Sequence, residues 1–118
     1  MKTQRPRLLV VDDDRAILTL TGTIALAEGF DVATTVSGED AMRQLSQRPV
    51  DLVLLDLRMP GVTGLDVLRA IREVSPRCKV VLMTGYATID SAVEAVKLGA
   101  TDYLTKPFDL QRLRKLLM

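Results

Sequence analysis

The sequence predicts an α/β fold in which helices cover both faces of a doubly wound parallel sheet. Five short predicted strands alternate with five segments of helical periodicity along the 118 residues, an order that favours right-handed crossovers between parallel strands. Segment 52–55 is apolar throughout, as expected of a strand buried on both faces. No linker or low-complexity segment separates these elements, so residues 1–118 are expected to form one domain.

The first strand is expected at 8–11 and ends at three consecutive aspartates. Asp14, the third of them, can cap the next helix, whose end is expected at Gly29. Apolar residues at spacings of three and four form the stripe of this helix: Ile17, Leu20, Ile24 and Ala27. Segment 30–36 has β-branched residues and partial alternation, which is typical of a strand near a sheet edge.

A second helix is expected after the capping box at 37–40. Its apolar positions are Ala41, Met42 and Leu45, and Pro49 ends it. The strand at 52–55 then stops at Asp56, because the Met-Pro-Gly sequence that follows at 59–61 favours a turn.

The second half of the chain repeats the pattern. The expected elements are a helix capped by residues 63–66, a strand at 79–83, a helix from Thr88 to Gly99, a strand at 101–104 and a helix from Asp109. The apolar positions of the first two of these helices are Leu65, Leu68, Ile71, Ile89, Ala92, Val93 and Val96. The last helix is expected to carry Leu110, Leu113 and Leu117 inward, with its basic residues outside.

The composition excludes several classes of function. With 47% hydrophobic residues, 26% charged residues and a net charge of +1, the chain is expected neither to be disordered nor to bind nucleic acid or acidic membranes directly. The absence of histidine excludes an imidazole base, a histidine zinc ligand or a phosphohistidine on this chain. The single Cys78 favours a reducing, cytoplasmic compartment. The first apolar run is interrupted by acids, so neither a signal peptide nor a membrane span is expected.

Polar residues gather where the predicted strands end. Asp12 and Asp13 follow the first strand, Asp56 follows the third, and Thr84 and Lys106 follow the fourth and fifth. In a doubly wound sheet these ends meet at one edge, where ligands bind. Converging carboxylates raise one another's pKa unless a cation compensates them, and Mg²⁺ suits a site with few carboxylates that keeps water or phosphate oxygens as ligands. A backbone carbonyl in the turn after Asp56 could complete the ligand set.

A carboxylate held beside a cation can attack phosphorus, which makes Asp56 a candidate nucleophile. Phosphoryl transfer also needs positive charge and hydrogen-bond donors, which Lys106 and the Thr84 hydroxyl can supply. The sequence has no P-loop, so the expected phosphoryl donor is another protein or a small phosphorylated metabolite rather than bound ATP.

Each of these residues also has a structural interpretation. The two aspartates after the first strand can form a solvated capping turn, Asp56 can simply end a strand, and Lys106 can be a surface lysine. Thr84 can be a turn residue and Tyr103 a core aromatic. Their order at successive strand ends favours the functional interpretation.

Four fragments in this order resemble the receiver domain of two-component response regulators, and the resemblance extends over residues 8–117. The fragments are Val-Val-Asp12-Asp13, Leu-Leu-Asp56-Leu-Arg-Met-Pro-Gly, Met-Thr84-Gly-Tyr and Tyr103-Leu-Thr-Lys106-Pro-Phe. The resemblance implies a flavodoxin-like fold of five βα units in three layers, with strand order 2-1-3-4-5. Within the family, the Met-Thr-Gly-Tyr-Ala-Thr and Asp-Tyr-Leu-Thr-Lys-Pro-Phe-Asp segments are similar to receivers fused to σ54-dependent transcriptional activators.

The resemblance also implies a function. A histidine kinase would phosphorylate Asp56. Mg²⁺ would be held by Asp13 and Asp56, with Asp12 assisting, and by the backbone carbonyl of Arg58. Thr84 and Tyr103 would rearrange on phosphorylation. The surface around the fourth helix, fifth strand and fifth helix would mediate homodimerisation, and the expected output is control of transcription.

Two other functions remain open. Residues 12–14 contain the Asp-x-Asp of hydrolases that form an aspartyl intermediate, although Ala16 stands where these enzymes have Thr or Val. The third interpretation is an interaction module that is never phosphorylated, against which the intact acids, Thr84 and Lys106 argue. We expect a signalling switch that catalyses only its own phosphorylation and slow dephosphorylation. Because the last helix reaches Met118 without a capping signal, we expect a domain cut from a longer regulator, with a stand-alone receiver as the alternative.

Overall fold

The computed structural model describes residues 5–59, 61–85, 93–94, 96–106 and 109–118. Its strands are β1 (Arg7–Val11), β2 (Asp31–Thr35), β3 (Leu52–Asp56), β4 (Lys79–Thr84) and β5 (Asp102–Thr105). Its helices are α1 (Arg15–Ala27), α2 (Gly38–Gln47), α3 (Gly64–Val74) and α5 (Leu110–Leu117). Neighbouring strands are parallel, in the order β2-β1-β3-β4-β5. The predicted doubly wound fold is confirmed.

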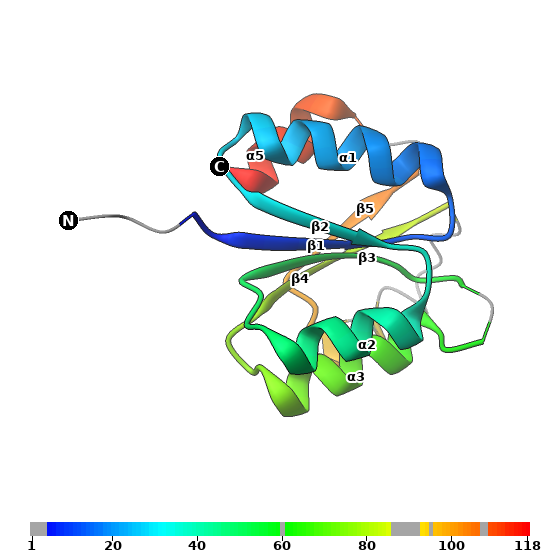
Figure 1. The fold of residues 1–118 in the computed structure, drawn as a ribbon. Helices are drawn as coiled ribbons and strands as arrows, with labels where there is room; N and C mark the ends of the chain where they lie inside the picture. Colours follow the sequence, from blue (N-terminus) through cyan, green and yellow to red (C-terminus); the bar gives the residue numbers. More distant parts are fainter. Residues whose placement is uncertain (1–4, 60, 86–92, 95, 107–108) are drawn as a thin grey trace.

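Helices cover both faces of the sheet, with α1 and α5 on one face and α2 and α3 on the other (Figure 1). β3 is buried along its whole length because it contributes to both cores. Leu52 and Leu54 pack in the cluster that includes α1 and α5, whereas Val53 and Leu55 pack in the cluster that includes α2 and α3. This alternation explains why the sequence of β3 has no polar side.

The helix caps predicted within the described ranges are present, with one difference. Asp14 accepts a hydrogen bond from the Ala16 N–H at the start of α1, and α3 begins with a full capping box at 63–66. At α2 the Ser37 hydroxyl caps the helix as predicted, but the Ser37 N–H donates to the Thr35 hydroxyl at 3.3 Å. The reciprocal half of the predicted capping box is therefore replaced by a bond to the end of β2.

Several residues of the predicted apolar stripes are exposed: Leu20, Ala27, Met42 and Leu110. The prediction that Leu110 points inward is wrong, since it is 44% exposed while Leu113 and Leu117 are buried. In α1 the buried face includes Thr21, because its hydroxyl donates to the Ile17 carbonyl at 2.7 Å and so needs no water. A stripe drawn through apolar residues alone misses a threonine of this kind.

The helix predicted at 88–99 lies partly outside the described residues. Of its predicted positions, Thr88, Ile89 and Ala92 are not described, whereas residues 93–94 and 96–97 are helical. Val93 and Val96 are exposed. Within the described ranges, no helix has the length and apolar character needed to cross a membrane.

Candidate functional site

The carboxyl ends of β1 and β3 place two buried carboxylates at the same edge of the sheet. Asp12 directly follows β1, and its N–H donates to the Thr35 carbonyl at 3.1 Å, which extends the β1–β2 pairing by one residue. Asp56 is the last residue of β3 and is 5% exposed, while Asp12 is fully buried. The prediction that these strand ends bring their acids together is confirmed.

Asp12, Asp13 and Asp56 form an acidic cluster. One carboxylate oxygen of each lies within 4.8 Å of the others, and Asp13 is the exposed member. Two backbone donors orient the buried members. The Asp14 N–H donates to Asp12 Oδ1 at 2.9 Å, and the Arg58 N–H donates to Asp56 Oδ1 at 3.2 Å.

Lys106 connects the two buried carboxylates. Its Nζ lies 2.6 Å from Asp12 Oδ2 and 3.7 Å from Asp56 Oδ1, and its side chain is 20% exposed. The lysine reaches this position because its own N–H donates to the Thr84 carbonyl at 2.7 Å, where β4 and β5 end together. Lys106 is therefore part of the site and is not a solvated surface lysine.

The pKa of Asp56 is raised to about 6. Burial is the main cause, and the neighbouring charge of Asp12 adds to it. The Lys106 ammonium and the Arg58 N–H lower this pKa, and Asp13 raises it slightly. The three carboxylates offer only oxygen atoms as ligands, a donor set that fits a hard divalent cation.

Gly64 holds the end of β3 in place, a role that the sequence analysis missed. A Cβ at this position would overlap the Asp56 carbonyl oxygen and lie 2.8 Å from Leu57 Cα. The Gly64 N–H also donates to the Leu57 carbonyl at 3.2 Å. The available signal was a glycine in the first turn of a predicted helix, directly after a strand and its turn.

The remaining predicted residues are Arg58, which follows β3, and Thr84 and Tyr103, which belong to β4 and β5. Thr84 ends β4 and is 1% exposed. Tyr103 lies in β5 opposite Leu82, is partly buried against the core beneath α2 and α3, and its carbonyl accepts a hydrogen bond from Arg112 at 3.2 Å. The proposed ligand role of the Arg58 carbonyl and the switch roles of Thr84 and Tyr103 stay predictions.

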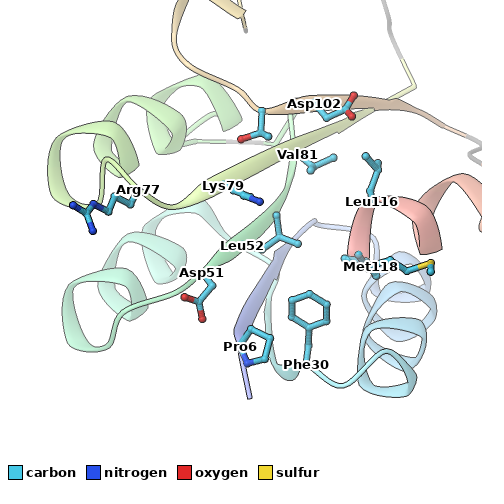
Figure 2. Close-up of a pocket in the computed structure, with 12 residues that line it drawn as sticks. Pro6, Phe30, Asp51, Leu52, Arg77, Lys79, Val81, Asp102, Leu116 and Met118 are labelled. Atoms are coloured by element: carbon cyan, nitrogen blue, oxygen red, sulfur yellow. The ribbon is translucent and has the colours of Figure 1, made fainter. Parts of the chain in front are cut away.

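A cavity lies at the other end of the sheet, where β3 and β4 begin (Figure 2). This cavity of about 500 Å³ has an apolar lining that includes Phe30, Leu52 and Val81, with Asp51, Arg77, Lys79 and Asp102 among the charged residues around it. Leu52 and Lys79 are the first residues of β3 and β4. The cavity is therefore separated from the acidic cluster by the length of the sheet.

Comparisons with known proteins agree with this geometry. A family model described as response regulator receiver domain matches residues 8–118. Transcriptional regulatory protein ZraR of Salmonella typhimurium is 40% identical over 110 residues, which are 93% of this chain and 25% of that protein. The chain thus spans about a quarter of the length of the curated relatives it matches.

Two solved structures show the same fold. A receiver domain protein of Methanospirillum hungatei matches with a TM-score of 0.92 and 29% identity, covering 97% of this chain and 91% of that one. A response regulator of Burkholderia pseudomallei, solved with a phosphorylated aspartic acid, a calcium ion and citrate, matches with a TM-score of 0.88 and 26% identity. That match covers 96% of this chain and 66% of that one.

Proposed function

The chain belongs to the response regulator receiver domain family, and we propose that it is a signalling switch that accepts a phosphoryl group on Asp56. The observation that carries this proposal is the arrangement of Lys106 between Asp12 and Asp56, at 2.6 Å and 3.7 Å. A buried carboxylate at a strand end, with a second carboxylate and an ammonium beside it, has the groups that phosphoryl transfer requires.

Asp56 is the proposed nucleophile. Above its pKa of about 6 the carboxylate is ionised and can attack phosphorus. An oxygen–phosphorus bond forms at Asp56 while the bond between phosphorus and the donor breaks, and the leaving group takes the electron pair and a proton. Family membership makes a phosphohistidine of a histidine kinase the proposed donor, and because this chain has no histidine, that residue belongs to a partner protein.

Asp12, Asp13 and Asp56 are the proposed side-chain ligands of Mg²⁺, with the Arg58 carbonyl as a fourth protein ligand. When bound, the cation neutralises charge on the carboxylates and on the phosphoryl oxygens. Two observations support this assignment: the three carboxylates converge within 4.8 Å, and a relative of the same fold was solved with a phosphorylated aspartic acid and a calcium ion.

Lys106 and Thr84 are the proposed groups that respond to the new phosphoryl group. Lys106 is shared between Asp12 and Asp56, and additional negative charge at Asp56 would draw its ammonium toward the phosphoryl oxygens. Because the Lys106 N–H is bonded to the Thr84 carbonyl, this shift acts on the ends of both β4 and β5. Rearrangement of the Thr84 hydroxyl and of Tyr103 would follow.

The proposed output surface is formed by the helix predicted at 88–99, β5 and α5. The chain would form a homodimer through this surface. Val93 and Val96 are 46% and 71% exposed and offer apolar contact area there. Relatives named as transcriptional regulators support a role in controlling transcription. We propose a cytoplasmic switch of this kind rather than a hydrolase with multiple turnover.

Phosphorylation with acetyl phosphate and Mg²⁺, followed by intact-mass measurement, tests the proposal. We expect one added phosphoryl group per chain, which is lost slowly and is absent in Asp56→Asn or when the metal is chelated. Asp31→Asn, an exposed acid at the other end of the sheet, is the matched control and should label normally.

Two results would contradict the proposal. Rapid turnover of aryl phosphates that persists in Asp56→Asn but is abolished by Asp12→Asn would identify a hydrolase. Neither labelling nor Mg²⁺ binding would identify a module that is never phosphorylated.

A further inference from the structure

The start of α2 lies very close to the loop after β3. Gly38 is the first residue of α2, and Val62 belongs to the loop that connects β3 to α3, which lies beside this end of the helix (Figure 1). A Cβ on Gly38 would lie 2.7 Å from the Val62 carbonyl oxygen and 3.0 Å from Val62 Cγ1. Because a real Cβ essentially never comes within 3.0 Å of another heavy atom, only a glycine permits this approach.

The backbone conformation of Gly38 does not itself require a glycine. Among the described residues, positive φ angles occur at Gly29, Gly61 and Gly99 and not at Gly38, so an alanine could adopt the same backbone. Alanine is also the residue that helices favour most, and glycine is one of the least favoured. The close approach of the loop is therefore the structural reason for a glycine at this position.

The start of α2 is tied to the end of β1. The Ser37 N–H donates to the Thr35 hydroxyl at 3.3 Å, and the Thr35 carbonyl accepts a hydrogen bond from the Asp12 N–H at 3.1 Å. These bonds fix the first turn of α2 relative to the strand end that carries Asp12 and Asp13.

The loop on the other side of the contact carries Arg58. Val62 stands two residues before Gly64, whose N–H donates to the Leu57 carbonyl at 3.2 Å. Leu57 directly precedes Arg58 and is buried in the cluster that includes α2 and α3. A displacement at Val62 would therefore pass across this hydrogen bond to Arg58.

We propose that Gly38 is a positioning residue for the Mg²⁺ site, because its contact with Val62 sets the separation between the acids after β1 and Arg58 after β3. This inference rests on the proposed function, which assigns three carboxylates and the Arg58 carbonyl as ligands. An alanine at this position would push the loop away from α2 by several tenths of an ångström. Mg²⁺ demands near-ideal coordination geometry, so the chain would keep all of its ligands but hold them at the wrong separation.

Calorimetric titration of the unphosphorylated chain with Mg²⁺ alone tests the proposal. Gly38→Ala should bind Mg²⁺ about tenfold more weakly than the native chain, as expected when the support of a ligand is displaced. Gly22→Ala is the matched control, because it adds the same methyl group to α1, where a Cβ would meet the side chains of Val32 and Thr34 at ordinary distances of 3.7 and 3.8 Å. Its Mg²⁺ affinity should equal that of the native chain.

A second control separates metal affinity from stability. Leu113→Ala removes a buried side chain from α5, on the opposite face of the sheet from α2 (Figure 1). It should lower the free energy of unfolding but leave the Mg²⁺ affinity of the folded chain native. A second variant at the contact itself is Val62→Ala, which adds no atom and removes the Cγ1 that lies against Gly38. It should also weaken Mg²⁺ binding, because the loop loses its support on α2.

Labelling with acetyl phosphate gives a further readout. Gly38→Ala should label more slowly than the native chain at low Mg²⁺ concentration and approach the native rate at saturating Mg²⁺, because Asp56 and Lys106 are unchanged. An equal loss of rate at every Mg²⁺ concentration would contradict a role in positioning the ligands.

The outcomes distinguish this inference from the proposed function. If the native chain binds Mg²⁺ and labels on Asp56 while Gly38→Ala has native Mg²⁺ affinity, the inference is overturned and the phosphoryl-acceptor proposal stands. An equal loss of affinity in Gly22→Ala or Leu113→Ala would identify general destabilisation as the cause and would overturn the inference as well. A native chain that neither binds Mg²⁺ nor labels would overturn the proposed function and this inference with it.

Discussion

Replacing Asp56 with asparagine should stabilise the fold at neutral pH in the absence of metal. The pKa of Asp56 is about 6 in the folded chain, against an ordinary value of 3.8. The folded state therefore holds a proton that the unfolded chain has already lost between these two values, and the stability of the native protein falls as pH rises through this window. Asparagine has the shape of the acid without its charge.

The magnitude follows from the shift. A difference of about two pH units corresponds to about 3 kcal/mol, an upper bound because Lys106 and water can relax around the ionised group. The stability difference between Asp56→Asn and the native chain should change little below about pH 4, grow in favour of the variant up to about pH 6.5, and then stay constant.

Urea unfolding at a series of pH values, with EDTA present, measures this difference directly. Adding Mg²⁺ at about one hundred times its dissociation constant should then stabilise the native chain by up to about 2.7 kcal/mol and the variant by less. Asp31→Asn is the control, since it removes an exposed charge far from the site. Parallel stability curves for the native chain and Asp56→Asn, or a variant that is less stable at neutral pH, would refute the electrostatic reasoning.

Three further predictions concern other parts of the structure. Gly64→Ala should lower the free energy of unfolding by about 2–4 kcal/mol, because its Cβ would overlap the Asp56 carbonyl. At Gly85 a Cβ would lie 4.0 Å from Lys106 Cβ, an ordinary van der Waals contact, so Gly85→Ala should change the free energy of unfolding by less than about 1 kcal/mol. Urea unfolding of both variants decides this. Asp40→Asn should lower the free energy of unfolding by about 1–2 kcal/mol at neutral pH, since hydrogen bonds from Thr35, Gln44 and Arg43 lower the pKa of Asp40 to about 2. The difference in stability between this variant and the native chain should shrink as pH falls from about 4 toward 2. A difference that does not change with pH would contradict the prediction. Lys106→Ala should retain Mg²⁺ binding, measured by calorimetry, but impair the response to phosphorylation, and an unaltered phosphorylation-induced change in scattering would exclude its role.

The sheet and the location of the site could be predicted because both depend on local sequence patterns. An uninterrupted apolar run such as β3 indicates burial on two faces, and parallel strands necessarily bring their carboxyl ends to one edge. Asp12, Asp56 and Lys106 could therefore be assigned to one site from three separate segments.

Other features depend on which side of each helix packs against the sheet, and they could not be predicted in this way. Periodicity indicates that α1 is helical, yet only the packed structure shows that Thr21 is buried and Leu20 exposed. Likewise, the sequence gives no reason for Lys106 to lie closer to Asp12 than to Asp56. The two carboxylates are almost equally buried, so only the packed structure shows that Lys106 Nζ lies 2.6 Å from Asp12 Oδ2 and 3.7 Å from Asp56 Oδ1.

The contact at Gly64 has a consequence for how a signal leaves the site. The backbone after Asp56 is fastened on two sides, by the Leu57 N–H to the Met83 carbonyl at 3.0 Å and by the Gly64 N–H to the Leu57 carbonyl at 3.2 Å. The proposed nucleophile thus stands on backbone held by both of these bonds, while Lys106 reaches it through a long side chain. In the proposed switch, new charge at Asp56 would displace the Lys106 side chain rather than the backbone of β3, and this displacement would pass outward through the ends of β4 and β5, which the bond from the Lys106 N–H to the Thr84 carbonyl joins.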